Sequence, residues 1–134
     1  MQMGVNPTAL NEIVTMFHSM FKSPIEISPA LEQQYFRAAL GEYALNIREL
    51  PYDASSESFE RTLTYSEILT LALMMYTRYL TQELSRVLKL NGIGGKDVTM
   101  TGVPASKTQT AGELQHELEY VQRLLYKQMR HCYA

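Results

Sequence analysis

The segment from Tyr65 to Leu90 contains neither glycine nor proline, and this feature constrains the fold of the chain more than any other. As a single helix it has about 26 residues and extends ~39 Å, at a rise of about 1.5 Å per residue. The residues at its start, Thr64-Tyr65-Ser66-Glu67, fit a capping box, in which the threonine hydroxyl and the glutamate carboxylate each accept a backbone N–H. The segment therefore predicts one long helix that begins directly after Thr64.

The two halves of this predicted helix differ in character. The first half is apolar on nearly all sides, through Ile68, Leu69, Leu71, Ala72, Leu73, Met74, Met75 and Tyr76. A helix that is apolar all round is normally enclosed by other elements. The second half keeps only an apolar stripe, formed by Tyr79, Leu80, Leu84, Val87 and Leu88. We therefore expect the helix to begin at the centre of a bundle and to end nearer the surface or a partner.

Three further helices are predicted from start signals and helical spacing. Asn6-Pro7-Thr8 marks the start of a helix that ends before Pro24, and Ser28-Pro29 starts a second helix that ends at Pro51. A second capping box, Thr110-Ala111-Gly112-Glu113, opens a last helix over 112–130. The apolar faces of the three are Ile13, Met16, Phe17 and Met20, then Phe36, Leu40, Tyr43, Ile47 and Leu50, and finally Leu114, Leu118, Val121 and Leu125.

Two connecting segments complete the chain. Residues 52–63 are a linker rich in serine and acidic residues, in which we expect one short turn of helix that docks Phe59 and Leu63. Residues 91–111 contain several glycines, and Val98-Thr99-Met100-Thr101 alternates apolar and polar residues as a short strand does. Loops of this length are usually functional or disordered. We predict an extended arm that contacts a neighbouring chain through Ile93, Val98, Met100 and Val103.

The composition predicts a single domain, residues 1–134, built as an all-α bundle of about four helices. The chain is 46% hydrophobic and 19% charged, which is sufficient apolar material for a core. Its one cysteine, Cys132, excludes an internal disulfide, and no apolar run reaches the ~20 residues of a membrane span. Residues 1–4 lack the basic and apolar blocks of a signal peptide, so we expect an intracellular protein with no membrane partner.

The charge is small in total and unevenly distributed. A net charge of −2 argues against a protein whose main task is to hold phosphate backbones. Residues 1–77 carry a formal charge of −5, whereas residues 78–134 carry +3. This asymmetry would let copies attract each other head to tail, although chance accounts for it equally well.

The sequence contains no motif that predicts catalysis, a metal or a cofactor. The glycine-rich segment 92–97 lacks the first glycine and the Ser or Thr of a phosphate-binding loop. Glu113 and Glu117 fit a solvated helix face better than an acid–base pair. The histidines and the cysteine lack the spacing of metal ligands: His18, His116, His131 and Cys132. We therefore expect a protein that is not an enzyme and that binds no cofactor.

Tyrosine is frequent, with nine residues in a chain that has no tryptophan. A bundle of this size cannot enclose all of them, and tyrosine is favoured at protein interfaces. We expect Tyr120, Tyr126 and Tyr133 of the last helix to serve at such an interface. The predicted binding surface of this helix consists of Tyr120, Arg123, Tyr126, Lys127 and Arg130.

Part of the sequence resembles a known family. The stretches 59–63, 65–75 and 79–80, preceded by the alanine-containing stretch 36–44, resemble the small head–tail connector (adaptor) proteins of tailed bacteriophages. The resemblance covers residues 30–90 and lies in the pattern, without an invariant signature. It implies a small helical bundle that forms a ring of about twelve copies beneath the portal and lengthens the DNA channel.

The same resemblance implies partners and a location. The partners would be the portal protein, neighbouring copies of the chain, stopper or tail proteins, and double-stranded DNA that passes through the channel without sequence-specific binding. The location would be the neck of the virion, after assembly in the cytoplasm of the bacterial host. By position, the arm 91–111 and the helix 112–130 match the segments that dock on the portal. The glycine-containing insertion is a departure from the shorter family members.

Two alternatives remain open from the sequence. A small helical regulatory or nucleic-acid-binding module would use Arg123, Lys127 and Arg130 on phosphates, and its affinity would fall steeply with salt. Another neck or tail-completion protein is the second alternative, but such proteins are more often rich in β structure.

Overall fold

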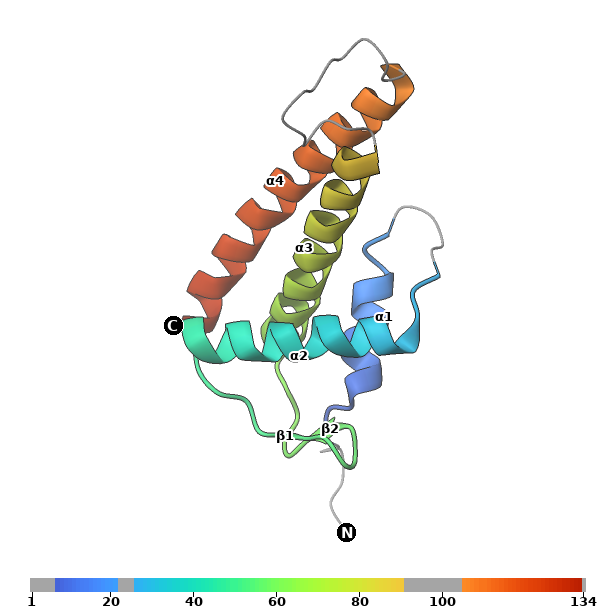
Figure 1. Ribbon diagram of the computed structural model, residues 1–134. Coiled ribbons are helices and arrows are strands. Elements are labelled where there is room, and N and C mark those ends of the chain that lie inside the picture. Colours follow the sequence, from blue (N-terminus) through green and yellow to red (C-terminus); the bar gives the residue numbers. More distant parts are fainter. Residues whose placement is uncertain (1–6, 22–25, 91–104, 134) are drawn as a thin grey trace.

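The computed structural model describes residues 7–21, 26–90 and 105–133 (Figure 1). The described residues form four helices, α1 Leu10–His18, α2 Pro29–Asn46, α3 Tyr65–Leu90 and α4 Ala105–Tyr133. Two short antiparallel strands, β1 Tyr52–Asp53 and β2 Ser58–Phe59, form a hairpin between α2 and α3. The predicted all-α bundle of about four helices is therefore confirmed, with the long central helix α3 and an α4 of similar length.

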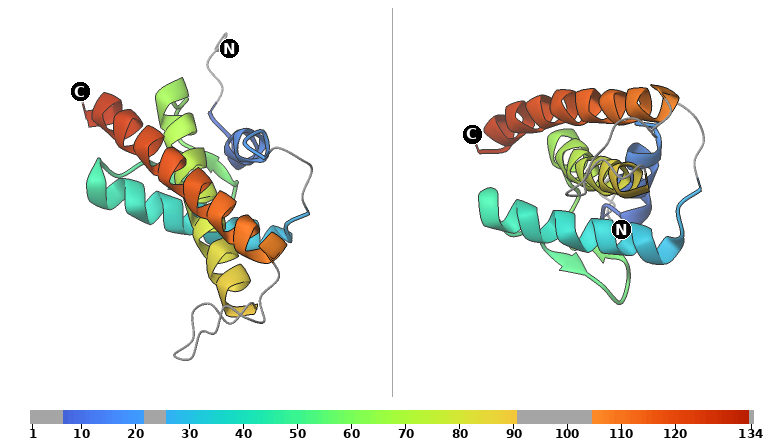
Figure 2. Two further views of the ribbon diagram at one scale, coloured as in Figure 1. Left: turned by 90° about the horizontal axis from the view of Figure 1, so that it is seen from above. Right: turned by 45° about the horizontal axis from the view of Figure 1, so that its top comes forward.

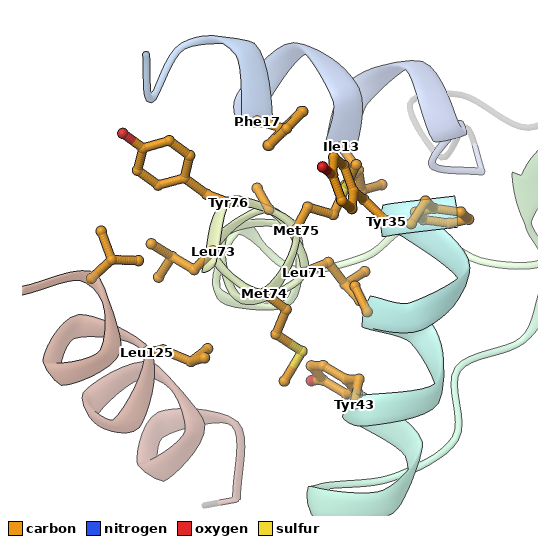
Figure 3. Packing of buried hydrophobic residues seen from close by; sticks show 14 of the residues in the cluster. Ile13, Phe17, Tyr35, Tyr43, Leu71, Leu73, Met74, Met75, Tyr76 and Leu125 are labelled. Carbon is orange, nitrogen blue, oxygen red and sulfur yellow. The ribbon is translucent and has the colours of Figure 1, made fainter. Parts of the chain in front are cut away.

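Helix α3 lies at the centre and contacts each of the other three helices. Seven consecutive residues of its first half, Thr70 to Tyr76, are buried. Figure 3 shows Ile13 and Phe17 of α1, Tyr43 of α2 and Leu125 of α4 around this part of α3. In its second half Leu80 is buried and the rest of the predicted stripe is partly buried. The expected change from an enclosed start to a more exposed end is confirmed.

Helices α2 and α4 pack on α3 in two different ways. Helix α4 runs antiparallel along α3, whereas α2 crosses it (Figures 1 and 2). As a result α4 covers one side of α3 over most of its length, whereas α2 covers a shorter part and reaches the second half through the Tyr35–Gln82 hydrogen bond and the Glu42–Arg78 ion pair. The second half of α3 keeps an open side.

Two of the predicted helix starts are confirmed by their capping bonds. The Glu67 N–H donates to Thr64 Oγ1 at 3.1 Å, and the Thr64 N–H donates to Glu67 Oε1 at 2.8 Å. At the start of α2 the Leu31 N–H donates to Ser28 Oγ at 3.2 Å, and Pro29 is the first helical residue. Both caps satisfy backbone donors that have no partner inside the helix.

The predicted start of the first helix at Asn6-Pro7-Thr8 is wrong, because α1 begins at Leu10. Thr8 is buried, and its hydroxyl accepts the N–H of Leu63 at 2.8 Å. Its backbone pairs with the same segment, since the Phe59 N–H donates to the Thr8 carbonyl at 2.7 Å. These bonds hold Thr8 extended against the hairpin and keep it out of the helix. The helix ends at His18, and the predicted stop at Pro24 lies outside the described residues.

The segment between α2 and α3 also differs from the prediction. Helix α2 ends at Asn46, before Pro51, and a hairpin replaces the expected turn of helix. Phe59 and Leu63 are nevertheless buried, as predicted. Glu57 closes the hairpin in the left-handed region, at φ 52°.

The last helix is longer than predicted, because α4 begins at Ala105 and ends at Tyr133 where 112–130 was expected. The segment 105–110 contains no glycine or proline, and Pro104 directly before it suits a helix start. Extension over this segment therefore costs little, and the capping box at Thr110 lies inside the helix. The predicted arm shortens accordingly. Its proposed contact residues Ile93, Val98, Met100 and Val103 lie outside the described residues.

Within the described part of the chain, none of the helices combines the length and the apolar character needed to cross a membrane.

Candidate interaction surfaces

Helix α4 has an inner face that packs on α3 and an outer face that is exposed. The inner face buries Ala111, Leu118, Val121 and Leu125, and Leu114, Leu124 and Met129 are partly buried against the core. The five residues predicted from the sequence as a binding surface are all exposed: Tyr120, Arg123, Tyr126, Lys127 and Arg130. We call these five residues the α4 face. Steps of three, four and three residues place Tyr120, Arg123, Lys127 and Arg130 on one side of the helix.

The α4 face combines aromatic and cationic side chains. The Tyr120 residue is 49% exposed and Tyr126 is 65% exposed, which is unusual for side chains of this size. The guanidinium carbon of Arg123 lies 6.0 Å from the centre of the Tyr120 ring, at the outer limit of a cation–π contact. Arg123, Lys127 and Arg130 form no ion pair with another described residue. Such a surface suits a protein interface or an anionic partner. The side chain of Tyr133 lies outside the described residues.

The acidic residues of α4 precede this cationic part. Glu113 and Glu119 are exposed, as expected for a solvated face. Glu117 differs, because it is partly buried beside Tyr76 of α3. Burial, helped by the carboxylate of Glu117, raises the pKa of Tyr76 to about 12. This contact therefore belongs to the packing of α4 on α3.

A groove between α2 and the second half of α3 is the second candidate surface, and sequence reasoning missed it. Its volume is about 920 Å³. The α3 wall carries three cations, Arg78, Arg86 and Lys89, whereas Glu42 is the acidic residue of the lining. Tyr35 and Gln82 also line the groove, and the Tyr35 hydroxyl donates to Gln82 Oε1. The remaining lining residues are small or polar and follow at steps of four: Gln34 and Ala38 on α2, and Thr77, Thr81 and Ser85 on α3. This repeated step of four could have indicated the groove from the sequence, because residues four positions apart lie on the same side of a helix.

The cations of the groove differ in how far they are neutralised. Arg78 lies 3.7 Å from Glu42 across the groove, a long ion pair. Arg86 pairs with Glu83 one turn earlier on α3. Lys89 is exposed, and its side chain forms no hydrogen bond or ion pair within the described part of the chain. The groove therefore has a net positive charge that increases towards the end of α3.

One buried carboxylate has a structural role. Glu67 is 1% exposed, and Arg61 donates to both of its oxygens at 3.0 and 2.7 Å. Arg48 adds a third bond at 3.1 Å. These bonds, chiefly those of Arg61, lower the pKa of Glu67 to about 2. Since every partner comes from the chain that leads into α3, the cluster fixes that chain to the helix start.

The histidines described by the structure do not build a metal site. His18 Nε2 lies 2.7 Å from Glu32 Oε1, which joins α1 to α2, and His116 is exposed on α4. In the described ranges, no three His, Cys, Asp or Glu side chains gather closely enough to hold a metal ion. His131 and Cys132 have no described side chains.

Comparison of the chain with protein-family models, with curated proteins and with solved structures finds no match.

Proposed function

We propose that this chain is a head–tail connector (adaptor) protein of a tailed bacteriophage. In this role about twelve copies form a ring between the portal and the tail, and the ring lengthens the channel through which DNA passes. The chain acts as a structural component of the virion neck, assembled in the bacterial cytoplasm. Its partners are the portal protein, other copies of itself and the next protein towards the tail.

The α4 face is the observation that carries this proposal. A surface with two exposed tyrosines and three cations has the composition of an interface, in which aromatic residues and arginine are enriched. It lies on the helix that matches by position the docking segment of the resembling family. The resemblance over residues 30–90 and the helical fold are compatible with the same role.

Binding to a portal ring tests the proposal. We expect the wild-type protein to co-sediment with portal rings from the phage that encodes it. The variant Tyr126→Ala with Arg130→Glu should bind at least about tenfold more weakly, because such residues dominate interface energies. Glu113→Lys, exposed at the other end of α4, is the control and should bind like the wild type. A wild-type protein that never joins the portal would refute the connector role.

Nucleic-acid binding is the second candidate, favoured by the three cations of the α4 face. Phosphate contacts make affinity fall steeply with rising salt. An electrophoretic shift assay at two salt concentrations therefore decides between the two. The connector proposal expects no stable complex with a short duplex at either concentration, since DNA has to slide through the channel.

A further inference from the structure

We infer that the groove between α2 and α3 receives the acidic hairpin of a second copy of this chain, in a head-to-tail contact. The inference rests on the proposed function in one respect, because it assigns surfaces to the contact between ring subunits. Two surfaces form this contact, and their charge and placement support it.

The first surface is the groove itself. Its wall on α3 carries Arg78, Arg86 and Lys89 against the single acid Glu42. Arg78 pairs with Glu42 and Arg86 with Glu83, so the exposed Lys89 leaves the groove with one excess positive charge. The hydroxyls of Thr77 and Thr81 donate to carbonyl oxygens one turn earlier, and the Tyr35 hydroxyl donates to Gln82 across the groove, so the charged side chains are the groups that an occupant can complement. An occupant with acidic side chains fits this charge best.

The second surface is the hairpin and the chain around it, residues 49–60. This segment contains four acids and no lysine or arginine, and all four are exposed: Glu49, Asp53, Glu57 and Glu60. Between them lie Ser55 and Ser56, whose hydroxyls both bond to Asp53. Their hydrogen bonds hold the pKa of the Asp53 carboxyl below its ordinary value, so the hairpin keeps this negative charge. The segment thus has the chemistry that the groove requires.

The placement of the two surfaces requires two copies. In Figure 1 the hairpin lies on one side of α2 and the second half of α3 lies on the other. Gln33 of α2 donates to the Glu57 carboxylate at 3.1 Å, which holds the hairpin on its own side of the helix. Helix α2 therefore separates the hairpin from the groove of the same chain. A contact between two different surfaces is heterologous, and repeated copies then form a closed ring or an open filament.

Charge reversal of each surface tests this contact. In one variant, Arg86→Glu with Lys89→Glu reverses the groove, and in another, Glu57→Lys with Glu60→Lys reverses the hairpin. Each should weaken self-association about tenfold or more in sedimentation velocity over a concentration series, because like charges then face each other. Circular dichroism shows whether each variant is folded.

The combination of all four substitutions is the decisive variant. It has the net charge of the wild type, −2, and again places opposite charges across the contact. We expect its self-association to return to within a few fold of the wild type. The control Glu113→Lys with Glu119→Lys has the same net charge as the hairpin variant and leaves both surfaces intact, so it should assemble like the wild type.

Three results would overturn the inference. One is a wild-type protein that stays monomeric at all concentrations. The second is a folded four-substitution variant that fails to assemble, and the third is a single-surface variant that assembles normally. None of these results bears on portal binding, which is measured separately with the α4 face variants. If the protein binds the portal and these substitutions leave its self-association unchanged, the connector role is supported and the proposed contact is contradicted.

Discussion

Glu67 provides a test of how the chain entering α3 is held. Its carboxylate is buried and accepts bonds from Arg61, Arg48 and the Thr64 N–H. The bonds from Arg61 are the main reason why the pKa of Glu67 falls from 4.5 to about 2. Since one pKa unit corresponds to about 1.4 kcal/mol, this difference stabilises the folded protein by about 3 kcal/mol at neutral pH.

The sign of the pH dependence follows from the direction of this shift. Because the pKa of Glu67 is lower in the folded state, the stabilisation is complete above about pH 5.5 and is lost as the pH falls through 4.5 towards 2. At about pH 3 the protein has lost roughly 2 kcal/mol of it. The variant Glu67→Gln keeps the shape and the acceptor of the capping box but has no charge to lose.

Urea unfolding of the wild type and of Glu67→Gln at two pH values measures the effect. At pH 7 the free energy of unfolding should be about 3 kcal/mol lower in the variant, and at pH 3 the gap should shrink to about 1 kcal/mol. Glu60→Gln removes an exposed carboxylate from the same segment and should stay within about 0.5 kcal/mol of the wild type. A gap for Glu67→Gln that is equal at both pH values would show that the charge of Glu67 does not carry the stabilisation.

Three further substitutions test the core, the Thr8 contact and the α4 face. Phe36→Ala removes a fully buried ring that packs on Tyr52 and Phe59, and calorimetry should show a loss of about 3–5 kcal/mol. Thr8→Val keeps the shape but leaves the Leu63 N–H without its acceptor, so urea unfolding should show a loss of about 1–3 kcal/mol, and a neutral result would contradict this assignment. Tyr126→Ala should change stability by less than about 0.5 kcal/mol, because the side chain is largely exposed, yet weaken co-sedimentation with portal rings. If Tyr126→Ala instead lowered the stability of the protein as much as it lowered binding, the side chain would have a role in the core.

The features that could be predicted from the sequence are those with local causes. The starts of α2 and α3 depend on caps in which Ser28 and Thr64 bond to residues three positions away, so the pattern alone indicates them. The burial of the first half of α3 follows from its continuous apolar composition. The exposure of the α4 face follows from helical periodicity in the same way, and its role as a binding surface stays a prediction.

The features that could not be predicted depend on distant partners. The first helix starts late because Thr8 bonds to Leu63, 55 residues further along the chain. Glu67 is recognisable as a capping residue, but its bonds from Arg48 and Arg61 arise only when the chain has folded. Helix α4 starts at Ala105 and not at the capping box at Thr110, because the segment 105–110 has no glycine or proline to end a helix. The groove is missed for a related reason, since it exists only where α2 crosses α3.

The way α2 crosses α3 explains why the bundle retains polar surfaces for further contacts. An α2 parallel to α3 would cover the second half of α3 with an apolar face, as α4 does on the other side (Figure 2). Instead, the open side of α3 carries Thr77, Thr81 and Ser85 beside its cations. A contact formed there depends on charge, so it weakens as salt shortens the Debye length below about 8 Å. Assembly through the groove would then be reversible and salt-dependent, whereas the aromatic α4 face depends more on buried apolar area. Because the groove and the α4 face use separate residues, salt and mutation should affect self-association and portal binding independently.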